Sequence, residues 1–262
     1  MEHYVLLLEK GWSREMQLIT SWDDGYPSDL RLGELLRRYG ISGTFFVPRR
    51  NSEGKPVLTG PEVRELSALH EIGGHTLDHV YLRGVRSNVA HHQIRTGKAW
   101  IEDELGKPIS SFCYPGGKYN SEVIRAVRTA GFKWARTTEN LCSGLGQNAY
   151  KIPTTLQFFP HTGPILVRNL IRYPRSPEKL ATLTTILRAK SYWSGLGRLV
   201  ENWAASGRTM HIWGHSWEIE QLGLWRQLED LLRLVRDVGA LPLTISQACV
   251  AQFVRGDRVD RQ

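Results

Sequence analysis

The chain has 262 residues, of which 41% are hydrophobic, and its 34 Lys and Arg against 26 Asp and Glu give a formal net charge of +8. This length suits one barrel-sized domain, and 25 Gly and 12 Pro without a low-complexity tract argue against a disordered or collagen-like chain. No apolar run approaches the roughly 20 residues that a membrane-spanning helix needs, and no secretory signal pattern opens the chain. We therefore expect a soluble, cytoplasmic protein without a transmembrane segment.

The cysteines and the charge exclude further classes. Cys113, Cys142 and Cys249 are widely spaced and form no Cys-x-x-Cys pair, which excludes a disulfide framework and a zinc finger. The basic residues are scattered, without a run of five or six. The charge therefore indicates a solvated basic surface or, alternatively, a site for an anionic ligand, and no motif favours nucleic-acid binding.

Short β-rich runs alternate with amphipathic helical runs in the first half of the chain. The pattern predicts strands at 17–22, 43–47, 71–75, 111–114 and 132–137, and helices at 28–39, 61–70, 87–105 and 121–130. This alternation favours a parallel sheet or barrel over a sandwich or a helix bundle.

The alternation loosens after residue 138. We expect a loop at 139–150, a strand at 152–159, an insertion with three prolines at 162–177, helices at 178–190, 196–205 and 224–238, and strands at 209–214 and 241–243. No repeat or long linker divides the chain, so a single domain over residues 1–262, with a partly helical insertion near 139–205, is predicted.

The first candidate site is the pair Asp23 and Asp24, which ends the first predicted strand. Adjacent residues of a strand point to opposite sides, so one carboxylate can bind a metal while the other faces a reacting water. Active sites of β/α barrels gather at the carboxyl ends of the strands, where this pair lies. An ordinary Asp-Asp-Gly turn is the alternative interpretation.

The second candidate site is the pair His75 and His79, which follows Gly73-Gly74. On one helical turn, two histidines four residues apart present their rings on the same side, as a divalent metal requires. Capping or core histidines are the alternative.

Two further strand ends carry groups suited to catalysis. His215 follows the strand at 209–214, and histidine is the side chain best suited to donate a proton near neutral pH. Gly116 lies in a Pro-Gly-Gly break whose backbone N–H groups can stabilise an oxyanion. Taken together, the first two candidate sites and His215 place aspartate and three histidines at strand ends. This pattern predicts a mononuclear metallohydrolase, with nitrogen and oxygen ligands that suit Zn²⁺ or a similar ion.

The order of these motifs resembles that of the polysaccharide deacetylases, the NodB-homology group of carbohydrate esterases. The resemblance covers residues 17–217 and rests on Asp-Asp-Gly, H-T-x-x-H, Y-P-G-G-x-Y-N, G-F-x-x-A-R-T and a strand ending in Gly-His. It implies a distorted (β/α)7 barrel that removes N- or O-acetyl groups from sugars with a divalent metal, Zn²⁺ first and Co²⁺, Ni²⁺ or Mn²⁺ as alternatives.

The resemblance also implies roles for individual residues. Asp23 would be the general base, His215 the general acid, and the Gly116 N–H a donor to the oxyanion. The metal ligands would be Asp24, His75 and His79, and the residues in contact with substrate would be Tyr114, Pro115, Trp213 and Trp217.

Two positions depart from the family pattern. Cys113 stands where the family has an arginine that pairs with the base, and the Asp and Trp of the fourth motif are not recognisable in residues 132–138. We hypothesise that Arg136, on the following strand, supplies the missing positive charge to Asp23.

The expected substrate is an acetylated sugar or glycan precursor, with an anionic or lipid-linked form compatible with the basic charge. Two alternatives stay open: an amidase of the same fold that acts on a small non-sugar amide, and a non-catalytic carbohydrate-binding relative.

Overall fold

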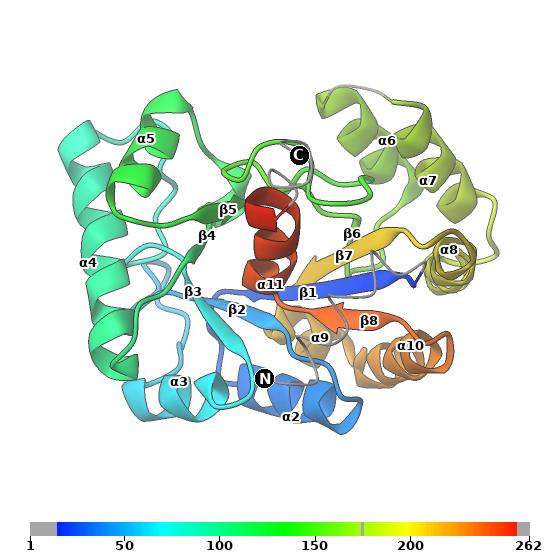
Figure 1. Ribbon diagram of the computed structural model, residues 1–262, viewed down its shortest axis with the longest axis horizontal. Helices are drawn as coiled ribbons and strands as arrows, with labels where there is room; N and C mark the ends of the chain where they lie inside the picture. Colours follow the sequence, from blue (N-terminus) through cyan, green and yellow to red (C-terminus); the bar gives the residue numbers. More distant parts are fainter. Residues whose placement is uncertain (1–14, 174–175, 256–262) are drawn as a thin grey trace.

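Parallel strands form a strongly curved sheet with helices along its outer face (Figure 1). The structure is a computed structural model that describes residues 15–173 and 176–255. Neighbouring strands follow the order β5-β4-β3-β2-β1-β7-β6, and β8 pairs with β1. Their bounds are β1 Gln17–Asp23, β2 Thr44–Val47, β3 Glu71–Gly74, β4 Ser111–Cys113, β5 Trp134–Arg136, β6 Leu156–Gln157, β7 Thr209–Gly214 and β8 Leu241–Leu243.

One segment, residues 152–157, brings the two edges of this sheet together. Ile152 forms a parallel bridge with Arg136 of β5, and β6 pairs with β7 through Leu156 and Gln157. The chain therefore bends the sheet into the distorted (β/α)7 barrel expected from the sequence. The strand expected over 152–159 is shorter in the structure because residues 152–157 divide their pairing between β5 and β7.

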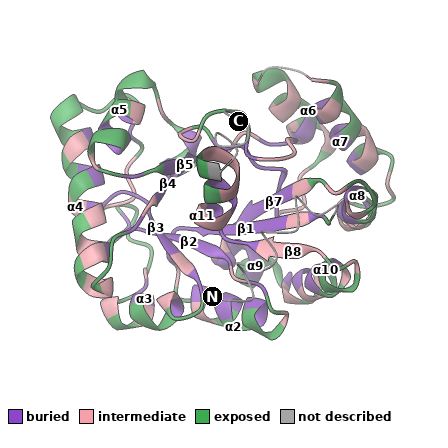
Figure 2. Cartoon of the chain, viewed as in Figure 1, coloured by how far each residue is buried: buried purple, intermediate pink, exposed green. Residues whose placement is uncertain are grey.

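Helices follow the strands and pack on the outside of the sheet. Their bounds are α2 Asp29–Arg38, α3 Gly60–Ser67, α4 Ser87–Leu105, α5 Ser121–Thr129, α6 Gly163–Arg172, α7 Pro177–Leu187, α8 Tyr192–Ser206, α9 Ser216–Leu222, α10 Trp225–Asp237 and α11 Ile245–Cys249. Figure 2 shows most of the strands as buried, β8 as largely intermediate, and the outward faces of the helices as exposed. In α10, for example, Leu228, Leu231, Leu232 and Val235 are buried at helical spacing and face the core.

Helix α11 closes the amino-terminal end of the barrel. Ser246 donates from its backbone N–H to Glu71 at 3.0 Å and from its hydroxyl at 2.6 Å, and it accepts from Trp134 Nε1 at 3.0 Å. Glu71 and Trp134 are the first residues of β3 and β5. The opposite, carboxyl end of the strands is left for the functional site.

The insertion between β6 and β7 consists of α6, α7 and α8. No helix was predicted within residues 162–177, but most of them form α6, in which Pro164 occupies a first-turn position where its missing N–H costs nothing. The sequence also did not predict α9 and α11. In the described residues, no helix is both long and apolar enough to span a membrane.

Candidate active site

A cavity of about 310 Å³ opens at the carboxyl ends of the strands. Asp23 and Asp24 from the end of β1, His75 and His79 after β3, and His215 after β7 all line it. The structure therefore brings together five residues that lie up to 192 positions apart in the sequence, as the barrel topology predicts.

Asp24, His75 and His79 converge on one point of this cavity. Asp24 Oδ1 lies 3.5 Å from His75 Nε2 and 3.0 Å from His79 Nε2, and one ligand atom from each residue lies within 4.8 Å of the other two. His75 Nδ1 donates to the Cys113 carbonyl at 2.9 Å. Because a carbonyl only accepts, Nδ1 carries a proton in this bond, and Nε2 is the ring nitrogen of His75 that faces Asp24.

The backbone around the cluster adopts an unusual conformation. Asp24, Thr76 and His79 have φ values of 79°, 67° and 54°, although none is a glycine, and each such residue costs about 1–3 kcal/mol. The two histidines were expected on one helical turn, and this expectation is wrong. They lie in a loop, and the left-handed conformations of Thr76 and His79 turn both rings to the same side.

The donor set fits a divalent metal. One carboxylate oxygen and two imidazole nitrogens are the ligands that Zn²⁺ and similar ions take in catalytic sites. Burial raises the pKa of Asp24, but hydrogen bonds with His75 and His79 and the charge of His215 outweigh it and hold the pKa well below its usual range. Asp24 is therefore an anion at neutral pH. Its second oxygen, Oδ2, accepts from Trp217 Nε1 at 3.0 Å, which fixes the carboxylate.

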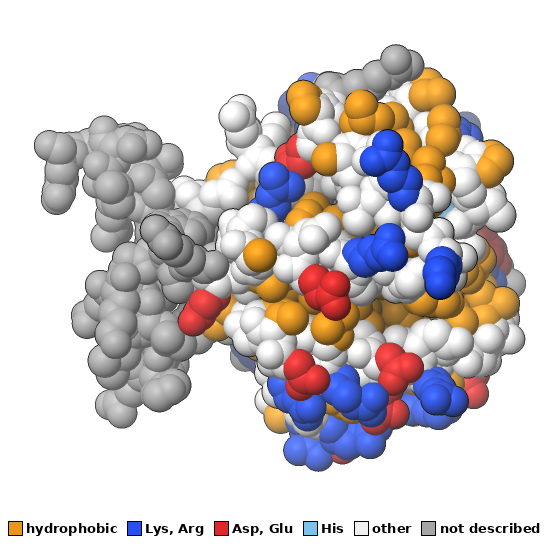
Figure 3. All heavy atoms as spheres, turned by 90° about the vertical axis from the view of Figure 1, so that its right-hand side faces the viewer, with side chains coloured by type: hydrophobic (Ala, Val, Ile, Leu, Met, Phe, Trp, Pro, Cys, Tyr) orange, Lys and Arg blue, Asp and Glu red, His pale blue; other side chains and the backbone are white. Residues whose placement is uncertain are grey.

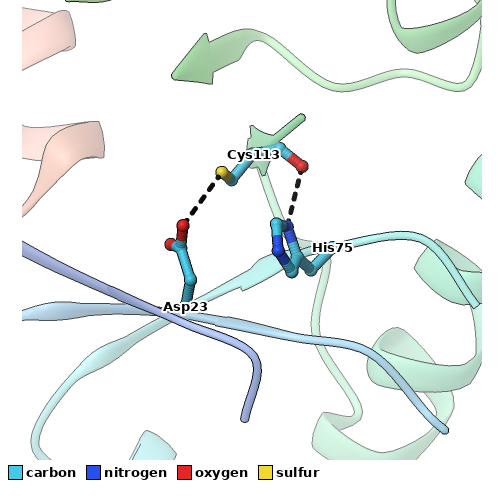
Figure 4. A group of neighbouring side chains, drawn as sticks. All are labelled: Asp23, His75 and Cys113. Carbon is cyan, nitrogen blue, oxygen red and sulfur yellow. Dashed lines mark hydrogen bonds between the residues drawn. The ribbon is translucent and has the colours of Figure 1, made fainter. Parts of the chain in front are cut away.

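Asp23 lies beside this cluster and is held from two sides. The fully buried Arg136 guanidinium forms an ion pair with Asp23 Oδ1, and the Cys113 thiol donates to Asp23 Oδ2 at 3.6 Å (Figure 4). Burial raises the pKa of Cys113 well above its ordinary value, so the thiol stays protonated. Arg136 of β5 thus supplies the positive charge beside Asp23, while Cys113 of β4 supplies a neutral hydrogen-bond donor.

His215 belongs to a hydrogen-bonded chain that includes a residue the sequence analysis did not predict. His215 Nδ1 donates to Glu218 Oε2 at 2.7 Å, and Gln157 Nε2 donates to the same oxygen at 2.9 Å. Burial lowers the pKa of His215, but the bond to Glu218 and the charges of Asp24 and Glu218 raise it to about 9. His215 is therefore protonated at neutral pH.

Glu218 left a signal in the sequence. His215 caps the amino end of α9 and Glu218 is its third residue, the position from which a glutamate normally reaches back to the cap. Here the carboxylate binds the imidazole of the capping histidine instead. No comparable signal points to Asn140, which lines the cavity and accepts from Trp213 Nε1 at 2.9 Å.

The remaining predicted residues divide into two groups. Gly116, Trp213 and Trp217 line the cavity. Gly116 has a φ of 58°, and a Cβ there would lie 2.7 Å from the Tyr81 ring. Tyr114 and Pro115 are buried and are not among the residues that line it, and the Tyr114 hydroxyl donates to the carbonyl of Tyr150 at 3.1 Å. Their contact with substrate stays a prediction.

The sequence that forms this site is similar to that of known proteins. Residues 12–135 match the sequence model of the polysaccharide deacetylase family. This part of the chain is similar to the polysaccharide deacetylases. It is 31% identical over 123 residues to a peptidoglycan-N-acetylglucosamine deacetylase of Bacillus cereus, which covers 46% of this chain and 56% of that protein. It is 28% identical over 151 residues to YxkH of Bacillus subtilis, a protein classed with the polysaccharide deacetylases, covering 56% of this chain and 53% of YxkH.

The chain spans about half the length of these two polysaccharide deacetylases. A solved structure from Mycobacterium smegmatis, classed with the same family, superposes with a TM-score of 0.64 at 14% identity and covers 94% of this chain and 92% of that one. At this identity the likeness concerns the fold, and it agrees with the (β/α)7 barrel described above.

Proposed function

We propose that this chain is a metal-dependent hydrolase that removes an acetyl group from a sugar or glycan precursor. The observation that carries the proposal is the convergence of Asp24, His75 and His79 beside two groups suited to proton transfer, Asp23 and His215. The relationship to polysaccharide deacetylases supports the reaction class.

Asp24, His75 and His79 would hold the metal, with Zn²⁺ the first choice and Co²⁺, Ni²⁺ or Mn²⁺ as alternatives. When bound, such an ion polarises the acyl oxygen and makes a bound water more acidic.

Asp23 would act as the general base. It accepts a proton from the attacking water while the new C–O bond forms, and its contacts with Arg136 and Cys113 keep the carboxylate in one orientation. The backbone N–H of Gly116, which lines the same cavity, would donate to the oxyanion that develops on the acyl group.

His215 would act as the general acid. Its Nδ1 is bound to Glu218, so its protonated Nε2 is free to donate to the nitrogen of the departing amine. The C–N bond then breaks, and acetate and the amino sugar leave. Without this proton the amine would depart as an unstable anion, which is why an acid is needed at this position.

The cavity favours a substrate of modest size. Its volume of about 310 Å³ lies at the lower end for ligand pockets. Trp213 and Trp217 line it with flat rings that suit the apolar face of a sugar.

The test is the substitution Asp23→Asn with the exposed α4 residue Asp103→Asn as control. We expect acetate release from N-acetylated sugars to fall about 10²- to 10⁴-fold in D23N, with the metal content unchanged and D103N at wild-type activity. Near-wild-type release by D23N with metal bound would contradict the assignment. Release of an acyl group from small non-sugar amides alone would favour the amidase alternative.

A further inference from the structure

One wall of the cavity comes from the insertion and carries an ordered stripe of side chains. Ile165, Arg168, Asn169 and Arg172 of α6 line the cavity. Their spacing of i, i+3, i+4 and i+7 places all four on one face of the helix. The other faces of α6 are different, since Leu166 is buried and Val167 and Ile171 are exposed.

Within the part of the chain that the structure describes, the two arginines of this stripe form no ion pair with an acidic residue. In residues 15–173 and 176–255, the side chain of Arg172 instead lies 5.5 Å from the ring of Tyr173, and its charge partly offsets the rise that burial causes in the pKa of Tyr119. The other basic residue that lines the outer cavity, Lys55, is paired with Glu53 at 3.1 Å. Among the described residues that line the cavity outside the catalytic cluster, three are Lys or Arg and one is a carboxylate.

The stability of α6 does not explain why Arg168 and Arg172 stand four residues apart on it. Like charges four residues apart on a helix destabilise it by about 0.2–0.5 kcal/mol. The helix dipole favours Arg172 in the last turn, but its effect fades within one turn and does not account for Arg168. Figure 3 turns the side of the insertion towards the viewer, and in its upper half basic and hydrophobic side chains prevail over acidic ones.

The charge of Arg168 acts inside the cavity. Burial lowers the pKa of His161, the charge of Glu218 partly offsets this, and the charge of Arg168 adds to the lowering. His161 lines the same cavity, and its Nε2 lies 3.0 Å from Gln157 Oε1. Gln157 is bound in turn to Glu218, the partner of His215. Arg168 thus acts on the end of the hydrogen-bonded chain that begins at His215.

We propose that Arg168 and Arg172 bind a phosphate group carried by the acylated sugar. The proposal rests on the proposed function, because it assigns a substrate class to the same cavity. Two guanidinium groups one helical turn apart offer two planar forks, which suit the several oxygens and the double charge of a phosphate better than a single carboxylate. The catalytic cluster would take the acetyl group while α6 takes the phosphate.

The experiment measures equilibrium binding by calorimetry with the full-length, metal-loaded protein. The ligands are N-acetylglucosamine, its 1-phosphate, its 6-phosphate, and N-acetylmuramic acid, which carries a carboxylate. The variants are R168Q/R172Q and, as a matched control, R188Q, an exposed arginine of the same insertion that does not line the cavity.

We expect at least one sugar phosphate to bind the wild type at least ten times more tightly than the neutral sugar does. This advantage should disappear in R168Q/R172Q and persist in R188Q, with unchanged melting temperatures. The two phosphate positions distinguish a phosphate on C1, as in nucleotide-linked and lipid-linked sugars, from one on C6.

Three results would overturn the proposal: no advantage for either phosphate, an equal advantage in the double variant, or an equal gain for the carboxylate sugar. Acetate release by the wild type is measured in parallel. Release from the neutral sugar together with any of these results rejects the phosphate site and leaves the proposed function intact. Absence of release from every sugar rejects the proposed function, while the binding data still decide on the arginines.

Discussion

The inner and outer walls of the cavity differ in how their charges are held. In the inner wall, at the carboxyl ends of the strands, Asp23 is paired with Arg136 and His215 with Glu218, and all four side chains are at most 17% exposed. In the outer wall, Arg168 and Arg172 stand exposed on α6.

This difference suggests a division of work within the proposed function. Proton transfer needs groups fixed to within a fraction of an ångström, and buried pairs on strand ends provide that precision. Recognition of a variable part of the substrate needs long side chains that an insertion can change without disturbing the barrel. Substitutions in the inner wall should therefore have larger effects than those in the outer wall.

The largest effect is expected from Asp24→Ala. Removal of the only carboxylate of the metal cluster should lower the metal content of the purified protein by at least tenfold and acetate release by about 10³-fold or more. Elemental analysis and an acetate assay measure the two. The exposed α10 variant Asp230→Ala should change neither, and full metal occupancy in D24A would contradict the assigned ligand set.

Arg136→Met should combine a loss of stability with a loss of activity. The substitution leaves Asp23 buried without its charged partner, and breaking a buried ion pair in this way costs about 3–5 kcal/mol. Denaturant unfolding measures that cost, and the rate of acetate release should fall with a changed pH profile. Arg136→Lys keeps the charge and should recover part of both. An unchanged rate and pH profile in R136M would reject the hypothesis that Arg136 replaces the family arginine.

Glu218→Gln should impair catalysis without releasing the metal. Because Glu218 helps to raise the pKa of His215 to about 9, its neutralisation lowers that pKa and moves the alkaline limb of the pH–rate profile to lower pH. We expect kcat to fall about 10- to 100-fold at pH 8. Glu220→Gln, on the exposed side of α9, is the control. A merely structural role for Glu218 would leave the position of the alkaline limb unchanged.

The smallest effect is expected in the insertion. The Ser176 side chain accepts from the backbone N–H of Lys179 at 3.2 Å and caps α7. Ser176→Ala should therefore lower the free energy of unfolding by about 1 kcal/mol while metal content and kcat stay at wild-type values. A loss of metal in this variant would show that the two walls are not independent.

The sequence predicted most of the elements of the barrel. The helix at 87–105 and the strands at 209–214 and 241–243 have the expected bounds, because their hydrophobic periodicity and their flanking glycines are local signals. The insertion was less predictable. The three prolines of residues 162–177 indicated an insertion without a helix of its own, whereas a proline in the first turn, such as Pro164, is compatible with a helix.

The catalytic candidates were also predictable, since Asp23, Asp24, His75, His79 and His215 stand in short motifs at strand ends. Local sequence correctly suggested that they meet, but not how the two histidines are oriented, because their common direction comes from left-handed backbone at Thr76 and His79 rather than from a helical turn.

By itself, then, the sequence determined the β/α alternation and the residues able to bind a metal and move protons. Only the tertiary structure decided their partners: Arg136 beside Asp23, Glu218 beside His215, and the α6 arginines along the cavity wall. The physical reason is that a motif records what a residue does within a few neighbouring positions. An ion pair across 113 positions, or a cavity face on an inserted helix, exists only after the sheet has closed.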